Sequence, residues 1–166
     1  MWGTKDKGTT ALSHSALGEG ATGDILVVIC GDRQDSTLAS LGSYMARGAK
    51  RKVYLLYVIE VPRVLPLNAV LTQEAERANK LLEGAMEAAH RIGSETRVQV
   101  VQAREAGPAI VDEAKDQSTA MILIGHLRQN NVPQNELGKS VAYVLANAPC
   151  RVWLVQDRQE KLATNS

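Results

Sequence analysis

Five short apolar runs recur along the chain, and a segment with helical spacing separates each run from the next. The runs cover residues 25–29, 53–59, 98–101, 121–124 and 151–155. The first run, ILVVI, is continuously apolar and rich in β-branched side chains, which is typical of a strand buried on both faces of a sheet. Strands that alternate with helices in this way predict an α/β fold, in which a parallel sheet carries helices on both faces.

The segments between the runs predict four helices. The first begins at Asp35 or Ser36, either of which can cap a helix N-terminus. A long helix is expected at residues 71–92, and residues 109–114 are expected to lie in a shorter helix that starts near Gly107-Pro108. Asn135 is the natural cap of the last helix. The apolar stripe of that helix is predicted to consist of Leu137, Val141, Val144, Leu145 and Ala148.

We expect the strands to form an open, Rossmann-like parallel sheet of order 3-2-1-4-5. The 166-residue chain is long enough for one domain with a sizeable core. Residues 1–23 are rich in Gly, Ser, Thr and Ala and have no helical or strand period, so we interpret them as a flexible lead-in or linker. Residues 24–156 are predicted to form the folded domain, and residues 157–166 a polar tail.

Composition narrows the possible partners. The net charge is +1, phenylalanine is absent and aromatic residues make up 4% of the chain, so neither a basic surface nor a stacking cluster for nucleic acid is expected. Two cysteines, Cys30 and Cys150, make no disulfide framework and suit a reducing compartment. No apolar run is long enough to span a bilayer, and no segment has the pattern of a secretory signal. We therefore expect a cytoplasmic domain that does not itself insert into a membrane.

Ligands of open α/β sheets bind at the carboxyl ends of the strands, where the strand order reverses. In the expected order this point lies between the first and fourth strands, whose ends are Cys30-Gly31 and Gly125-His126. The last helix carries Gly138, Lys139 and Ser140 in its first turn, and a helix N-terminus favours a phosphate because its free N–H groups and dipole are positive. These features predict an anionic ligand at this edge.

The chain offers little support for catalysis. Asp32, Arg33 and Asp35 form a polar loop whose plain role is turn formation and capping, and whose alternative role is contact with a ligand or Mg²⁺. His126 has no evident nucleophile beside it. Gly138-Lys139-Ser140 is similar to the end of a Walker A loop, but Pro133 stands where that motif needs its first glycine. We interpret the chain as a non-enzyme and leave weak ATP hydrolysis open.

Residues 25–155 resemble a universal stress protein domain. The segments that carry the resemblance are ILVV at 25–28, LYVI at 56–59, ILIG at 122–125 and, above all, APCRVWLV at 148–155. Two shorter segments, VIEVP at 58–62 and QARE at 102–105, are similar to versions fused to membrane transporters of the amino-acid permease type. The first resemblance implies binding of ATP, AMP or another adenine nucleotide, and the second a domain tethered to a transporter.

The family's phosphate motif has three glycines followed by a hydroxyl residue. Gly125 and Gly138 match the first and third glycines, whereas Arg128 and Lys139 replace the second glycine and the hydroxyl. Both replacements are cationic and are expected to face the phosphates, and Ser140 can supply the missing hydroxyl. The positions that hold adenine in the family fall on Cys30, in place of an acid, and on Val58.

Two functions follow from this pattern. In one, the domain senses an adenine nucleotide without catalysis; in the other, Arg128 and Lys139 fill the site and the domain acts by contacting partners, such as a transporter. In either case the apolar last strand is predicted to be an exposed edge that pairs with its copy in a homodimer, as the resemblance also implies. The predicted contact residues are Val152, Trp153, Leu154 and Val155.

Overall fold

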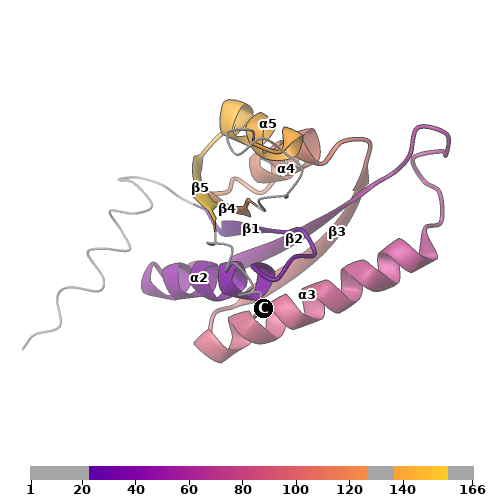
Figure 1. Ribbon diagram of the computed structural model, residues 1–166. Helices are drawn as coiled ribbons and strands as arrows, with labels where there is room; N and C mark the ends of the chain where they lie inside the picture. The colour runs from indigo at the N-terminus through magenta and orange to yellow at the C-terminus, as the bar shows by residue number, and fades with distance from the viewer. Residues whose placement is uncertain (1–22, 127–136, 157–166) are drawn as a thin grey trace, which may run out of the picture.

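The computed structural model describes residues 23–126 and 137–156. These residues form five strands and four helices in strict alternation, as Figure 1 shows. The strands are β1 (Ile25–Ile29), β2 (Val53–Glu60), β3 (Thr96–Ala103), β4 (Met121–Gly125) and β5 (Arg151–Val155). The helices are α2 (Asp35–Gly48), α3 (Thr72–Ile92), α4 (Ala106–Asp116) and α5 (Lys139–Asn147). The predicted alternation of strands and helices is confirmed.

All five strands are parallel and lie in the order β3-β2-β1-β4-β5, which confirms the predicted fold. The central strand β1 has no side chain more than 3% exposed. It pairs with β2 along its whole length but with β4 only over its first three residues, up to Val27 opposite Leu123. The two strands therefore separate toward their carboxyl ends, at the point where the strand order reverses.

Helices cover both faces of the sheet (Figure 1), α2 and α3 on one side and α4 and α5 on the other. The first layer packs on Val27 and its neighbours through Leu38 and Leu82. The second packs on Leu26 through Ile110 and Val144. Because alternate side chains of a strand point to opposite faces, the continuous apolar runs supply both cores at once.

The predicted cap of the first helix is wrong. Gln34, in a helical conformation, occupies the cap position of α2, and no side chain of the described residues caps the first turn. Asp35 is instead the first residue of the helix, and its carboxylate accepts hydrogen bonds from the end of β1. The N–H groups that follow β1 compete for this acceptor, and the sequence pattern alone does not show that competition.

The last helix is shorter than its apolar pattern indicates. It begins at Lys139 after the cap residue Gly138, while the expected cap Asn135 lies outside the described residues. Val141 and Val144 are buried as predicted, but Leu137 is 41% exposed and Leu145 is 42% exposed, so their assignment to the core is wrong. Nine residues make only about two and a half turns, and a single narrow stripe of such a helix faces the sheet.

None of the helices within the two described stretches is both long enough and apolar enough to cross a membrane. The longest, α3, has 21 residues but a charged outer face.

Candidate functional site

The ends of the parallel strands bring most of the predicted site residues to one edge of the sheet. Cys30 and Gly31 follow β1, and Val58 is one residue beyond Tyr57, which pairs with Ile29. Cys30 therefore leaves β1 at the level of Val58 on β2. Gly125 ends β4, and the N–H of His126 donates to the carbonyl of Val155 on β5 at 2.9 Å.

The loop between β1 and α2 satisfies its own polar groups. The Asp35 carboxylate accepts hydrogen bonds from the N–H of Cys30 at 3.0 Å and from that of Gly31 at 2.8 Å. Asp32 Oδ1 accepts from the N–H of Gln34 at 2.6 Å, which forms an Asx turn. Gly31 has φ +86°, a conformation that favours glycine, and it allows the chain to fold back onto Asp35.

Burial shifts the pKa values of two groups in this loop. Burial raises the pKa of Asp35, while the two backbone hydrogen bonds from Cys30 and Gly31 lower it in part. Desolvation by the surrounding protein raises the pKa of the Cys30 thiol to about 12, and the charges of Asp35 and Asp32 add to the effect. Cys30 is nevertheless exposed at the surface, so it is an accessible thiol with very little thiolate.

Gly125 lies directly against the β1–α2 loop. A Cβ at this position would come within 3.1 Å of both Gln34 Oε1 and Leu38 Cδ1. Gln34 is 3% exposed, so its amide is packed into the space where β1 and β4 separate. The absence of a side chain at Gly125 therefore lets Gln34 and Leu38 pack against the end of β4.

The start of α5 is the exposed part of the site. A Cβ added at Gly138 would meet no atom of the described residues within 4 Å, and none of their side chains caps the helix. Lys139 Nζ lies 2.9 Å from Glu105 Oε1, and Arg63 lies at 4.0 Å from the same oxygen. The hydrogen bond and charge of Lys139 lower the pKa of Glu105. Ser140 follows and is half-buried.

Arg128 lies outside the described residues. Within residues 23–126 and 137–156, no group of three or more His, Cys, Asp or Glu side chains is arranged to hold a metal ion. Asp32 and Asp35 instead bond to the backbone of their own loop.

Sequence reasoning missed several residues that shape this edge. Glu105 pairs with Lys139, and Glu60 Oε1 accepts from the N–H of Ala106 at 2.7 Å, at the start of α4. Arg77 of α3 approaches Gly31, since its Nη2 would lie 3.6 Å from a Cβ there. None of these contacts has a local sequence signal, because each joins segments that are distant in the chain.

The open, doubly wound parallel sheet, with its crevice at the reversal of strand order, places the chain among Rossmann-like α/β proteins. A family model described as "Universal stress protein family" matches residues 22–156. The chain therefore belongs to the universal stress protein family. A search of curated protein sequences gave no match.

Solved structures of this family share the fold at low sequence identity. A universal stress protein from Archaeoglobus fulgidus in complex with dAMP is 18% identical, with a TM-score of 0.66, over 81% of this chain and 98% of that one. A universal stress protein in complex with cAMP is 14% identical, with a TM-score of 0.66, over 82% and 98%. A family member from Arabidopsis thaliana with AMP bound is 14% identical, with a TM-score of 0.58, over 87% and 98%.

Proposed function

We propose that this chain is a non-catalytic regulatory domain that binds an adenine nucleotide and acts in the cytoplasm. The base would lie near Cys30, Gly31 and Val58, and the phosphates near residues 138–140. Membership of the family supports this proposal. So do three relatives with the same fold, whose structures contain dAMP, cAMP and AMP.

The observation that carries the proposal is the open N-terminus of α5. No side chain of the described residues caps its first N–H groups, and none of their atoms lies within 4 Å of a Cβ built on Gly138. These N–H groups and the helix dipole attract an anion. Lys139 stands beside them and is 82% exposed. Its pair with Glu105 is a surface ion pair, which a phosphate can replace at small cost.

The experiment is isothermal titration calorimetry with ATP, ADP and AMP, with and without Mg²⁺, on the wild type and on Lys139→Met. We expect binding of at least one nucleotide, weakened roughly tenfold by Lys139→Met, the equivalent of about 1.4 kcal/mol. Lys115→Met is the matched control, because Lys115 is an exposed lysine on α4 whose partner is Asp112. Glu105→Gln should tighten binding, since it frees Lys139 and removes a negative charge.

A second function has its own supporting observation. Gln34 packs beside Gly125, and Asp35 occupies the N–H groups at the end of β1, so the base side of the crevice is partly filled by the protein. This favours a nucleotide-free interaction domain, in which Arg128 and Lys139 would fill the phosphate side as well. Its attachment to a membrane transporter of the amino-acid permease type rests on the resemblance of residues 58–62 and 102–105 alone. Restoring the family's residues with Arg128→Gly and Lys139→Ser should then create ATP affinity; under the first proposal the same changes should reduce it.

We also propose that β5 forms a homodimer interface. It is an edge strand whose residues Val152, Trp153, Leu154 and Val155 are only half-buried. An edge strand leaves N–H and C=O groups unpaired, and a second copy can pair with them. At low protein concentration, where only the β5 interface is expected to be populated, Trp153→Lys or Val152→Pro should give monomers by light scattering. An unchanged mass for both folded variants would contradict this interface.

A further inference from the structure

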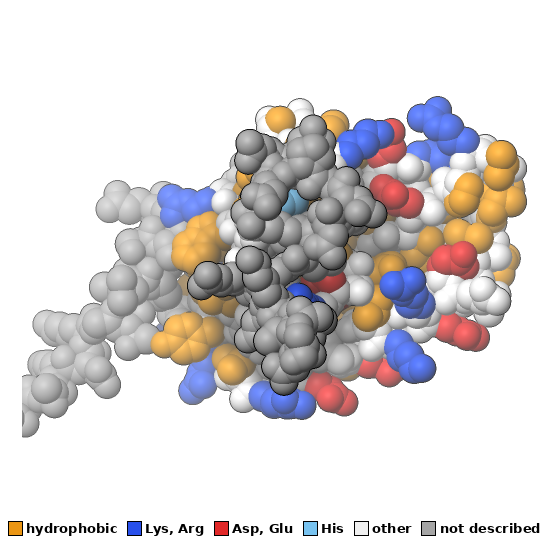
Figure 2. All heavy atoms as spheres, in the orientation of Figure 1, with side chains coloured by type: hydrophobic (Ala, Val, Ile, Leu, Met, Phe, Trp, Pro, Cys, Tyr) orange, Lys and Arg blue, Asp and Glu red, His pale blue; other side chains and the backbone are white. Residues whose placement is uncertain are grey.

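The loop between β2 and α3 carries an unusual number of exposed aliphatic side chains. Residues 61–70, which we call the apolar loop, extend beyond the sheet at one end of the molecule (Figure 1). Val64 and Val70 are each 90% exposed, Leu67 is 47% exposed and Leu65 is 38% exposed. In Figure 2 hydrophobic side chains gather at this end, beside positively charged ones.

The apolar loop is held in place from the end of β3. The Arg104 guanidinium donates to three of its carbonyls, from Nη1 to Val61 at 3.1 Å and Pro62 at 2.6 Å, and from Nη2 to Leu65 at 2.8 Å. Gln102 Nε2 donates to Ala69 at 3.2 Å. The aliphatic side chains are thus presented on an ordered backbone, which lowers the entropy cost of binding a partner.

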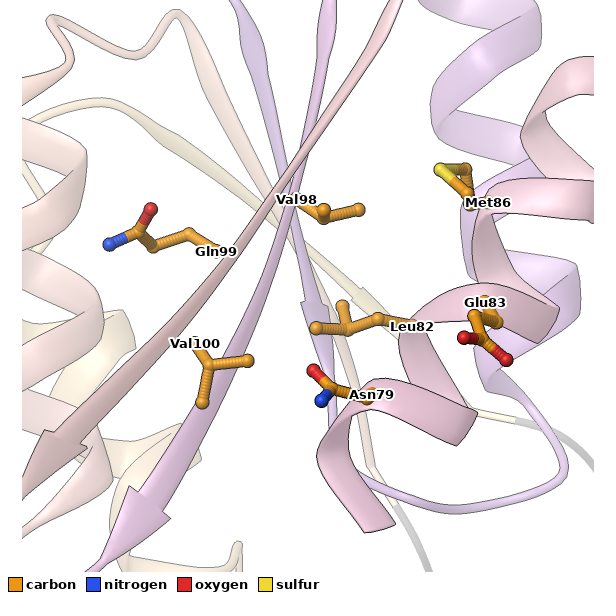
Figure 3. Close-up of a pocket in the computed structure, with 7 residues that line it drawn as sticks. All are labelled: Asn79, Leu82, Glu83, Met86, Val98, Gln99 and Val100. Carbon is orange, nitrogen blue, oxygen red and sulfur yellow. The ribbon is translucent and has the colours of Figure 1, made fainter. Parts of the chain in front are cut away.

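A hollow of about 350 Å³ lies next to the middle of β3, between this strand and α3 (Figure 3). Figure 3 shows Val98 on the α3 side of the strand and Gln99 pointing to the opposite side. The lining is mainly apolar and Glu83 borders it, whereas Val98 is 45% exposed. The full lining is Asn79, Leu82, Glu83, Met86, Val98, Gln99 and Val100.

We propose that a second copy of the chain docks along the β3 edge, with the apolar loop of each copy seated in the hollow of the other. β3 is an edge strand, and its residues 97–99 are exposed. The hollow is lined by residues 98–100 of β3. The apolar loop is hydrogen-bonded to residues 102 and 104, so it lies about four residues, or roughly 13 Å, further along the chain. A two-fold axis that passes between the hollow and the loop places β3 of the second copy antiparallel to β3 of the first. The apolar loop of each copy then meets the hollow of the other copy, and the contact closes as a dimer.

Charge supports this occupant. Arg63 at the base of the loop is 87% exposed, and its contact to Glu105 is long at 4.0 Å. In the two-fold arrangement Arg63 would approach the acidic rim that Glu83 gives the hollow.

The test is sedimentation velocity over a wide concentration range, with circular dichroism as a check on folding. The variants are made in a Trp153→Lys protein, which lacks the β5 interface, so that association through β3 can be measured alone. They are also made in the wild type, because Trp153→Lys can lower stability. We expect concentration-dependent dimers that Val64→Asp with Val70→Asp weakens more than about tenfold. Arg63→Glu and Glu83→Arg should each weaken the dimer at least about threefold, and the double reversal should restore it.

Lys115→Glu is the control for charge, because Lys115 lies on α4, on the opposite face of the sheet from α3, and it should leave the dimer unchanged (Figure 1). The proposal would be overturned by two results together: the folded Trp153→Lys variant is monomeric at every concentration, and the loop changes do not alter the association of the wild type. Failure of the double reversal to restore what the single reversals weaken would also overturn it. Flotation with anionic vesicles that depends on Val64 and Val70 would reassign the loop to a lipid surface.

Discussion

The two sides of the crevice at the carboxyl edge of the sheet are built differently. On the β1 side, polar groups are bonded to one another, Asp35 to the backbone of Cys30 and Gly31, and Gln34 is packed beside Gly125. On the α5 side, within the described part of the chain, Gly138 is open and Lys139 is held by an exposed ion pair. A ligand must displace protein contacts on the first side, whereas on the second it can bind to groups that are already exposed.

Because the β1 side is bonded to itself and the α5 side is exposed, the two sides would interact differently with an anionic ligand. A carboxylate that bonds two backbone N–H groups fixes the loop after β1 and occupies donors that an anion would otherwise use there. An anion is instead attracted to the start of α5, where the helix dipole and Lys139 are positive. This difference would orient a nucleotide, with its phosphates toward α5 and its base toward β1.

The largest effect that we expect from this difference between the two sides is on the rate of alkylation of Cys30, on the β1 side. Its pKa of about 12, against an ordinary 9.0, leaves at least about a hundredfold less thiolate than an ordinary thiol at the same pH. We expect iodoacetamide to modify Cys30 slowly up to high pH although the residue is exposed, as followed by mass spectrometry. Asp35→Asn should raise the rate. A fast reaction near neutral pH would show that the Cys30 thiol is not desolvated and that its pKa is not raised.

Removal of the Asp35 carboxylate should give the next largest effect. Asp35→Ala leaves the N–H groups of Cys30 and Gly31 without their acceptor, and hydrogen bonds to charged groups contribute about 1.5–3 kcal/mol each. Because burial of the charge offsets part of this, we expect a loss of roughly 2 kcal/mol in the free energy of unfolding by urea denaturation. Asp32→Ala, which removes one bond to Gln34, should cost about half as much.

The same carboxylate predicts a pH dependence with a definite sign. Burial raises the pKa of Asp35 in the folded state above its ordinary 3.8, so the folded state holds this proton more tightly than the unfolded state. The contribution of the Asp35 proton to stability is therefore present below about pH 4 and lost as the pH rises through the raised value. Compared with Asp35→Asn, the wild type should lose free energy of unfolding over this range. A wild type that instead gains stability over Asp35→Asn as the pH rises would show the opposite shift.

The sequence predicts the elements of this fold more fully than the contacts of its site. Continuous apolar runs report burial on both faces, so the strands follow from residues 25–29 and their counterparts, and their alternation with helices indicates a parallel sheet. The bond from Asp35 to Cys30, the pair of Lys139 with Glu105 and the packing of Gln34 on Gly125 depend on how loops fold back in space. No periodicity encodes these contacts. A helix pattern also overestimates burial at a short helix, as the exposed Leu137 and Leu145 show.

A matched pair of glycine substitutions tests the openness of the two sides. In Gly125→Ala the new Cβ would lie 3.1 Å from Gln34 and Leu38, so we expect a loss of roughly 1 kcal/mol as these side chains shift. In Gly138→Ala the Cβ meets no described atom within 4 Å and the backbone needs no positive φ. Alanine is a poorer N-cap than glycine, but it lowers the entropy of the unfolded chain, so the two effects nearly cancel and the net change should be about half a kcal/mol at most. Equal effects on the midpoint of urea unfolding would mean that the two sides are equally filled.

The smallest expected effect on stability concerns the ion pair on the α5 side. Lys139 and Glu105 are exposed, so Glu105→Gln should leave the midpoint of thermal unfolding unchanged within experimental error at neutral pH. Lys139 lowers the pKa of Glu105, so any contribution of the pair is present above the ordinary pKa of a glutamate and is lost as the pH falls below it. A clear destabilisation would mean that Lys139 is held firmly by Glu105, and that the phosphate side, like the β1 side, is closed by the protein's own contacts.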